Sequence, residues 1–155
     1  MGRIYNIIIP RTAVTAAVDL VEILTPAAVS AWIHRIKLSQ STEVGDAQEE
    51  MLQLAFKWGQ TTSGSGGSAA TPAKVLPGDA ASVLTCEVLN TTKATAGTIV
   101  TSWISDWNER VVFDEVFTPE TRLFIGPSTR ATIELVSAPA DGVTICGTIT
   151  VEEIG

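Results

Sequence analysis

The chain has 155 residues, of which 45% are hydrophobic and 17% charged, and its formal net charge is −7. A chain of this length is most simply one domain that buries about 70% of the surface exposed in its unfolded state, so it does not need disulfides for stability. The acidic charge argues against sequence-independent binding of nucleic acid, which needs clustered Lys and Arg. No apolar run approaches the roughly 20 residues of a membrane-spanning helix.

The first ten residues combine one Arg with a short apolar run that ends at Pro10. A secretory signal would need a longer apolar region and a cleavage site with small residues, so we expect this segment to belong to the mature protein. Residues 3–9 are predicted to form a strand. Because Pro10 cannot donate a hydrogen bond to a neighbouring strand, residues 1–10 should be either an arm or an edge strand.

Two stretches show the alternation of half-buried strands. In residues 49–60 the larger apolar side chains share one parity: Leu52, Leu54, Phe56 and Trp58. In residues 32–38 a second set does the same: Trp32, His34, Ile36 and Leu38. Since the two stretches are near neighbours in the sequence, we expect these strands to pair.

The rest of the chain is predicted to be strands separated by turns. Residues 13–24 also fit one face of a helix, but β-branched residues are dense and Thr25-Pro26 closes the segment, which favours a strand over residues 18–24. Five further segments lie between turn residues: 83–89, 98–103, 122–125, 131–136 and 143–152. Residues 61–78 form a long Gly/Ser/Pro loop. The pattern predicts an all-β, single-domain antiparallel β-sandwich over residues 1–155, jelly-roll-like, with about eight strands.

None of the polar motifs indicates catalysis. The one imidazole, His34, lies mid-strand and is expected to be a core or interface residue, because no serine or cysteine is marked as its nucleophile partner. The Gly/Ser segment at residues 63–68 matches neither the Gly-x-Ser-x-Gly turn nor a phosphate loop ending in Gly-Lys-Ser/Thr. Asn90-Thr-Thr matches the glycosylation pattern, which three residues meet often by chance. We predict no catalytic residue and no cofactor.

Metal binding is not indicated either. Cys86 and Cys146 stand apart in apolar surroundings, which favours two buried thiols in a reducing compartment and leaves a disulfide between them open. One acidic group lacks the calcium-loop spacing, so we interpret it as a solvated turn: Glu43, Asp46, Glu49 and Glu50. Other carboxylates do not form a recognisable pair for acid–base hydrolysis: Glu87, Glu109, Asp114, Glu115 and Glu120.

Three aromatic residues form the most unusual cluster in the sequence: Trp103, Trp107 and Phe113. Aromatic side chains beside the polar Asp106 and Asn108 fit a sugar-binding site or the anchors of a protein interface. Core indoles fit equally well, since Trp is common in protein cores. The three residues are therefore candidates for an interface, and the core alternative stays open.

Several segments resemble a known family. They are residues 7–20, 36–41 and 45–52, Gly59-Gln-Thr-Thr-Ser-Gly-Ser-Gly-Gly-Ser-Ala-Ala-Thr-Pro, Asn90-Thr-Thr and Trp107-Asn. With them the chain resembles, over residues 3–152, a family of small virion structural proteins of tailed bacteriophages that is similar to capsid cement (decoration) proteins. Residues 111–117 depart from the family pattern, which has more Pro and Trp there.

The resemblance implies a jelly-roll or β-sandwich subunit that forms homotrimers on the outside of the major capsid lattice. It implies the major capsid protein as partner and the virion capsid, assembled in the host cytoplasm, as location. It supplies no catalytic residue. A different interpretation, a carbohydrate-binding or host-facing module of a phage tail or fibre, would use Trp103 and Trp107 as stacking platforms. An esterase or glycosidase is a more distant third interpretation.

Overall fold

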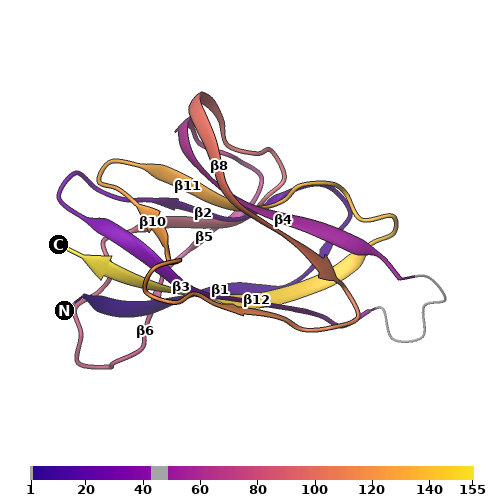
Figure 1. Ribbon diagram of the computed structural model, residues 1–155, viewed down its shortest axis with the longest axis horizontal. Coiled ribbons are helices and arrows are strands. Elements are labelled where there is room, and N and C mark those ends of the chain that lie inside the picture. The colour runs from indigo at the N-terminus through magenta and orange to yellow at the C-terminus, as the bar shows by residue number, and fades with distance from the viewer. Residues whose placement is uncertain (1, 43–48) are drawn as a thin grey trace.

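The computed structural model describes residues 2–42 and 49–155. These residues form twelve strands, arranged in two six-stranded antiparallel sheets that face each other (Figure 1). Within the described ranges there is no helix that could cross a membrane. The predicted all-β antiparallel sandwich is confirmed.

We call the two layers sheet A and sheet B. The strands of sheet A, in spatial order, are β10 (Leu123–Ile125), β3 (Ser30–Gln40), β12 (Val143–Ile154), β1 (Arg3–Val14) and β6 (Ala73–Lys74), with β9 (Phe113–Val116) also pairing with β3. Those of sheet B are β5 (Ser68–Ala70), β7 (Thr85–Asn90), β2 (Asp19–Leu24), β11 (Arg130–Leu135), β4 (Met51–Thr62) and β8 (Thr95–Asn108).

Eight of the strands pair in a nested order. β1 pairs with β12, β2 with β11, β3 with β10, and β4 with β8. This is the arrangement of a jelly roll, in which one long antiparallel ribbon is rolled into two sheets. The other four strands lie in connections: β5, β6 and β7 between β4 and β8, and β9 between β8 and β10. The prediction of about eight strands falls short of the twelve observed: its segments correspond to the eight frame strands and β7, and it lacks β5, β6 and β9.

The core lies between the sheets and is built from alternating residues of both. Tyr5, Ile7 and Ile9 of β1 point inward, as do Leu54 and Phe56 of β4. Each large apolar side chain removed from water contributes roughly 1.5–3 kcal/mol. Alternation in sequence thus becomes one apolar layer shared by two sheets.

The predicted pairing of residues 32–38 with residues 49–60 is wrong. The first segment is β3 of sheet A and the second is β4 of sheet B, so they lie in different sheets. Both strands place an apolar face on the same core from opposite sides. Alternation specifies only that a strand has one buried face, and it does not specify the neighbouring strand.

A β-bulge also corrects the predicted faces of β3. The pairing of β3 with β12 shifts register between Thr150 and Val151, which gives β3 one extra residue at His34. Ile33 before the bulge and Ile36 after it are both fully buried, whereas His34 is only half-buried. An extra residue in one strand reverses the parity beyond it, so Trp32 and His34 do not share the inner face of Ile36.

Trp58 and the N-terminal segment also differ from expectation. Trp58 is 37% exposed, since it lies past the edge of the core. β1 is an integral strand rather than an arm, and it continues beyond Pro10 to Val14 with a register shift between Ile9 and Thr12. β6 covers its outer edge only at Tyr5 and Asn6, so Pro10 lies where β1 is an open edge, as proline requires.

Candidate interaction surfaces

The outer face of sheet B is covered by the chain itself. The covering residues are the two ends of the connection between β4 and β8, residues 63–94, which we call the insertion; its strands β5 and β7 continue sheet B, and β6 joins sheet A. Ser63 Oγ and the Gly64 amide each donate a hydrogen bond to the carboxylate of Glu22 in β2, at 2.6 and 2.8 Å. Glu22 is 4% exposed as a result. The loop expected at residues 61–78 is thus fixed to the sheet, and it also contains β5 and β6.

Glu22 is the centre of a buried hydrogen-bond network. Besides the two insertion donors, it accepts hydrogen bonds from Arg130 Nε at 2.7 Å and from Asn90 Nδ2 at 3.1 Å. The carboxylate is therefore desolvated but fully paired, the condition under which a buried ion pair is tolerated. Asn90, the first residue of the glycosylation pattern, is 1% exposed and also donates to Glu87, so it is a structural residue rather than a surface acceptor.

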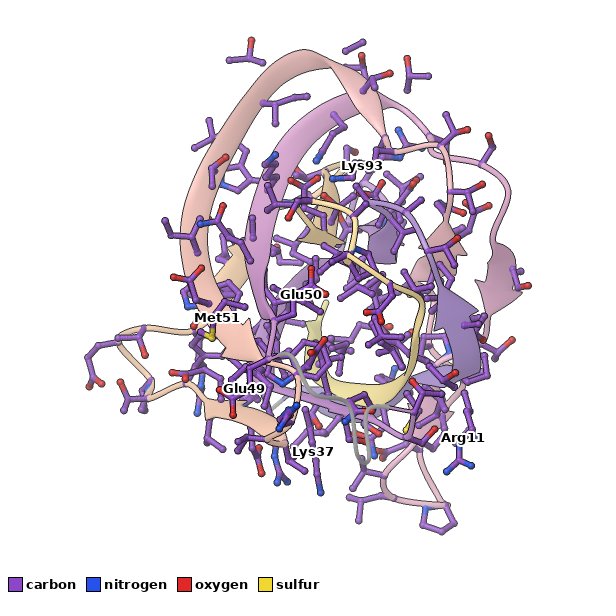
Figure 2. All side chains as sticks on the ribbon, turned by 90° about the vertical axis from the view of Figure 1, so that its right-hand side faces the viewer. Arg11, Lys37, Glu49, Glu50, Met51 and Lys93 are labelled. Carbon is purple, nitrogen blue, oxygen red and sulfur yellow. The ribbon has the colours of Figure 1, made fainter. Side chains whose placement is uncertain are left out.

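A second charged cluster lies farther along the same face. Glu134 of β11 contacts the ammonium groups of Lys57 and Lys93, and the Ala94 amide donates to Asp19 Oδ2 at 2.7 Å. Burial raises the pKa of Asp19 to about 6, a shift partly offset by the hydrogen bond from Ala94. Lys93 sits below the arch formed by β4 and β8 in Figure 2. These contacts hold the end of the insertion as Glu22 holds its start.

The outer face of sheet A is open by comparison. Its apolar residues remain accessible to solvent: Ile4 at 37%, Ile8 at 48%, Phe124 at 46% and Val116 at 65%. A shallow depression of about 450 Å³ lies at one end of this face, lined in part by Ile8, Lys37 and Cys146. This face offers a broad surface with scattered apolar side chains.

Two pairs of polar side chains contact each other on the open face, while Lys37 lies exposed beside the depression. Arg35 donates two hydrogen bonds to Asp114, at 2.7 Å from Nε and 2.6 Å from Nη2, and these bonds hold the pKa of Asp114 below its usual value. His34 Nε2 lies 2.8 Å from Glu152 Oε2. The expected core position of His34 is thus replaced by a half-buried one on the outer face, where its partner is a carboxylate rather than a nucleophile.

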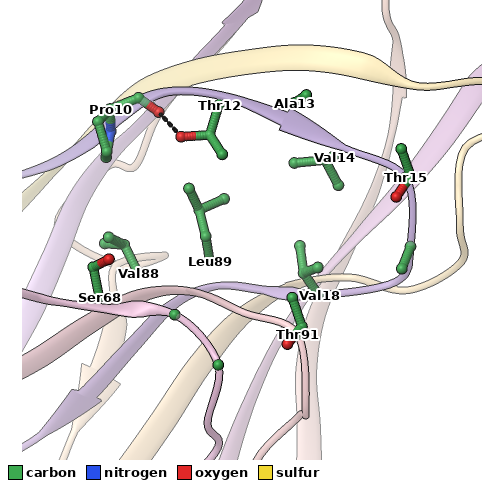
Figure 3. Close-up of a pocket in the computed structure, with 13 residues that line it drawn as sticks. Pro10, Thr12, Ala13, Val14, Thr15, Val18, Ser68, Val88, Leu89 and Thr91 are labelled. Carbon is green, nitrogen blue, oxygen red and sulfur yellow. Dashed lines mark hydrogen bonds between the residues drawn. The ribbon is translucent and has the colours of Figure 1, made fainter.

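A pocket of about 230 Å³ opens at the edge of the sandwich, between β1 and β7 (Figure 3). Val14, Val18 and Leu89 supply its apolar wall, and Leu89 extends toward its centre. Thr12 Oγ1 donates to the Pro10 carbonyl at 3.0 Å. None of the residues that line the pocket has an ionisable side chain, so the pocket presents no acid or base to a ligand.

An aromatic groove of about 350 Å³ lies between the two sheets at the base of β8. Trp58 of β4 and Phe124 of β10 line it, together with Glu120, Arg122 and Ser102. The Nε of Arg122 is buried and makes no hydrogen bond among the described residues. Exposed aromatic rings beside an Arg are typical of recognition surfaces. This groove was not predicted, because Trp58 shares its position in the alternation with the core residues Leu54 and Phe56.

The three predicted interface residues lie elsewhere and are brought together only in part. Trp107 is 2% exposed and its indole donates to the Val111 carbonyl at 2.6 Å, so it is a core residue. Trp103 is half-buried, with its ring centroid 6.2 Å from that of Phe113 and 5.8 Å from that of Phe117. Trp107 therefore offers no stacking platform, while Trp103 and Phe113 keep partly exposed sides.

The two cysteines and the acidic turn, which were considered as candidate sites in the sequence, have structural surroundings that do not suggest catalysis. Cys86 and Cys146 are free, which answers the disulfide left open by the sequence, and burial raises the pKa of Cys86 to about 12. Of the acidic turn, Glu43 and Asp46 lie outside the described residues, and Glu50 accepts a hydrogen bond from the Ala140 amide at 2.6 Å. Figure 2 places Glu50 next to the start of β4.

Within residues 2–42 and 49–155, no three His, Cys, Asp or Glu side chains gather closely enough to hold a metal ion. The class of protein defined by these observations is a jelly-roll-like β-sandwich with one face covered by its own insertion and one face open. No protein-family model, curated protein or solved structure matches the chain.

Proposed function

We propose that this chain is a capsid cement (decoration) protein of a tailed phage, a non-enzymatic homotrimer that binds the outside of the major capsid lattice and stabilises the head. Such a protein acts by burying surface between neighbouring subunits, which favours the assembled shell by mass action. The observation that carries the proposal is the open outer face of sheet A, opposite a face that the insertion already covers.

The charges of the open face suit it to docking. Arg35 forms an ion pair with Asp114, so a partner that covers this pair need not leave either charge alone. Glu152 accepts a hydrogen bond from the Gly2 amide and lies 2.8 Å from His34 Nε2, so it too has hydrogen-bond partners within the chain. Ile4, Ile8 and Phe124 lie among them as apolar anchors. A surface with apolar residues among satisfied polar groups has the composition of a protein interface.

Co-sedimentation with phage capsids that lack the protein tests the proposal. The wild-type chain should bind in many copies per particle and raise the temperature at which the capsid disassembles. Ile8→Glu places a charge in the open face and should abolish most binding. Val111→Glu, at a residue 62% exposed in the turn after β8, is the matched control and should bind as the wild type does.

Two results would contradict the proposal: a handful of copies per particle, or equal binding by both variants. The mass of the free protein is a second test, because a homotrimer has three times the mass of the 16.4-kDa chain.

The aromatic groove supports a second candidate, a carbohydrate-binding module. Trp58 and Phe124 are exposed there, beside Arg122. A sugar ring stacked on Trp58 would change the tryptophan fluorescence, and Trp58→Ala would remove that change. A panel of bacterial surface glycans with no effect on the fluorescence would eliminate this candidate.

A further inference from the structure

β8 has a free edge. Its one partner in the sheets is β4, and no backbone hydrogen bond from its other edge is found among the described residues. Strand edges expose unpaired N–H and C=O groups, and these groups pair readily with another strand. With 14 residues, β8 is the longest strand of the fold, so this edge is extensive.

The first half of β8 also projects from the body of the sandwich. We call Trp58–Thr62 of β4 together with Thr95–Ser102 of β8 the ribbon; it rises beyond the rest of the molecule at the top of Figures 1 and 2. Every residue from Thr95 to Ser102 is exposed except Val100, which is half-buried. On its β4 side the ribbon is held to sheet B, since Gln60 is 5% exposed and its Nε2 donates to Thr132 Oγ1 at 3.0 Å. The β8 side has no such support, so a strand added there would stabilise the ribbon.

The ribbon carries no charge. There is no Asp, Glu, Lys, Arg or His between Lys57 and Lys74, or between Lys93 and Asp106. Two copies of a chain with a net charge of −7 repel each other over most of their surfaces. Like charges that lie directly opposite each other destabilise a cross-strand pair. Two copies that meet at the ribbon would have no such charges in contact. This charge pattern suits a second copy of the same chain.

The open edge of β1 shows what a protected edge looks like in this protein. Pro10 removes a donor there, a register shift between Ile9 and Thr12 interrupts the strand, and Arg11 adds a charge. β8 contains no Pro, Lys or Arg. β8 also has register shifts against β4, near Ser102 and between Val100 and Gly97, and Ala96 and Gly97 have positive φ angles. This edge is therefore kinked as that of β1 is, but it carries neither a proline nor a basic side chain.

We propose that two copies of this chain pair through the free edges of β8, antiparallel about a twofold axis, along Thr95–Thr101. Sheet B of one copy then continues into sheet B of the other. The contact is isologous, since the same segment is used on both sides, and it is a case of strand addition in which the added strand comes from an identical chain. Ile99, which is 42% exposed, would be covered by the partner.

The inference does not depend on a capsid role. It also differs from the trimer contact, because a threefold assembly needs two different surfaces to meet. If a trimer forms through other surfaces, the β8 contact joins trimers in pairs. The mass of the assembly and its response to a change in β8 therefore separate the two proposals.

The test is light scattering behind a sizing column, at several protein concentrations. The wild type should have the mass of an even number of chains, two or six. Ile99→Lys places like charges within the paired segment and should weaken the association on the order of tenfold or more, so that the measured mass falls by half. Val112→Lys, at a residue 51% exposed in the turn after β8, is the control and should keep the wild-type mass.

Amide hydrogen exchange provides a second readout on the same samples. Thr95–Thr101 should be protected in the wild type and exchange rapidly in the Ile99→Lys variant. If that variant does not fold, Thr98→Lys at an exposed neighbouring position replaces it. A monomer, or an oligomer whose mass and exchange are unchanged by the lysine in β8, would overturn the proposal. A trimer that Ile99→Lys leaves intact would overturn it while agreeing with the proposed function.

Discussion

The two outer faces of the sandwich use the same kind of ion pair in opposite environments. On sheet B, Arg130 Nε lies 2.7 Å from Glu22, whose side chain is 4% exposed. On sheet A, Arg35 lies 2.6 Å from Asp114, with side chains 43% and 35% exposed. The distance between the charged groups alone would predict the same contribution to stability from both pairs. Burial distinguishes them, because an uncompensated charge is costly only where water cannot solvate it.

The largest expected effect comes from removing one partner on each face. Glu22→Ala leaves Arg130 buried without its carboxylate and releases Ser63 and Gly64, so it should cost about 3–5 kcal/mol. Asp114→Ala, the equivalent change on the open face, should leave the urea midpoint almost unchanged. Unfolding in urea measures both variants. Equal midpoints for the two would show that the insertion does not exclude water from Glu22.

A smaller effect is expected from packing between the insertion and sheet B. A Cβ added at Gly64 would lie 2.7 Å from the Thr92 carbonyl oxygen and 3.0 Å from Glu22 Oε2. Gly64→Ala should therefore push the insertion off the face and cost about 1–3 kcal/mol. Gly78→Ala is the matched control in the same insertion, since nothing lies within 4 Å of its added Cβ. Thermal unfolding of the pair measures the difference, and equal melting temperatures would refute close contact at Gly64.

The smallest of the three effects is a pH dependence caused by Asp19. Its pKa is about 6 in the folded chain against an ordinary value of 3.8, so between these values the folded state binds more protons than the unfolded state. The contribution of Asp19 to stability therefore falls as the pH rises from about 4 to about 6. Asp19→Asn keeps an acceptor for the Ala94 amide and removes the buried charge. At neutral pH this variant should be more stable than the wild type by about 1–2 kcal/mol.

The measurement is the free energy of unfolding of wild type and variant as a function of pH. The gap between them should close as the pH falls to about 4, because Asp19 is then protonated in the folded wild type. A gap that is constant over this range would show that the carboxyl titrates as it does in the unfolded chain.

Residue patterns predicted much of the frame but not its register. Alternation located β3 and β4 and put Leu54 and Phe56 in the core, as the structure confirms. Bulges are not encoded in alternation, so the outward position of His34 was missed. The partner of β3 was also missed. Alternation shows that one face of β3 is buried, but it does not specify which strand lies beside it.

The short strands and the surfaces were harder to predict. β5 and β6 lie in a Gly/Ser/Pro segment whose composition is that of a loop, and they become strands only by pairing with β7 and β1. β9 was also missed, since no strand was predicted in residues 111–117. Trp58 and Trp107 both lie in long strands, β4 and β8, yet Trp58 lines a groove and Trp107 is buried. Which indole meets solvent depends on where the core ends.

The nested pairing of the strands has a consequence for how the chain folds. The long partner of β1 is β12, more than 120 residues later in the sequence, so β1 cannot form this pairing until residues 143–154 have been synthesised. Loop-closure entropy makes such non-local contacts slow to form, and folding times of milliseconds to seconds are typical of β-sandwiches. During that delay Ile7, Ile8 and Ile9 are accessible together, next to Pro10. That proline, which limits β1 as an edge in the native state, also limits the pairing of the nascent strand with other chains.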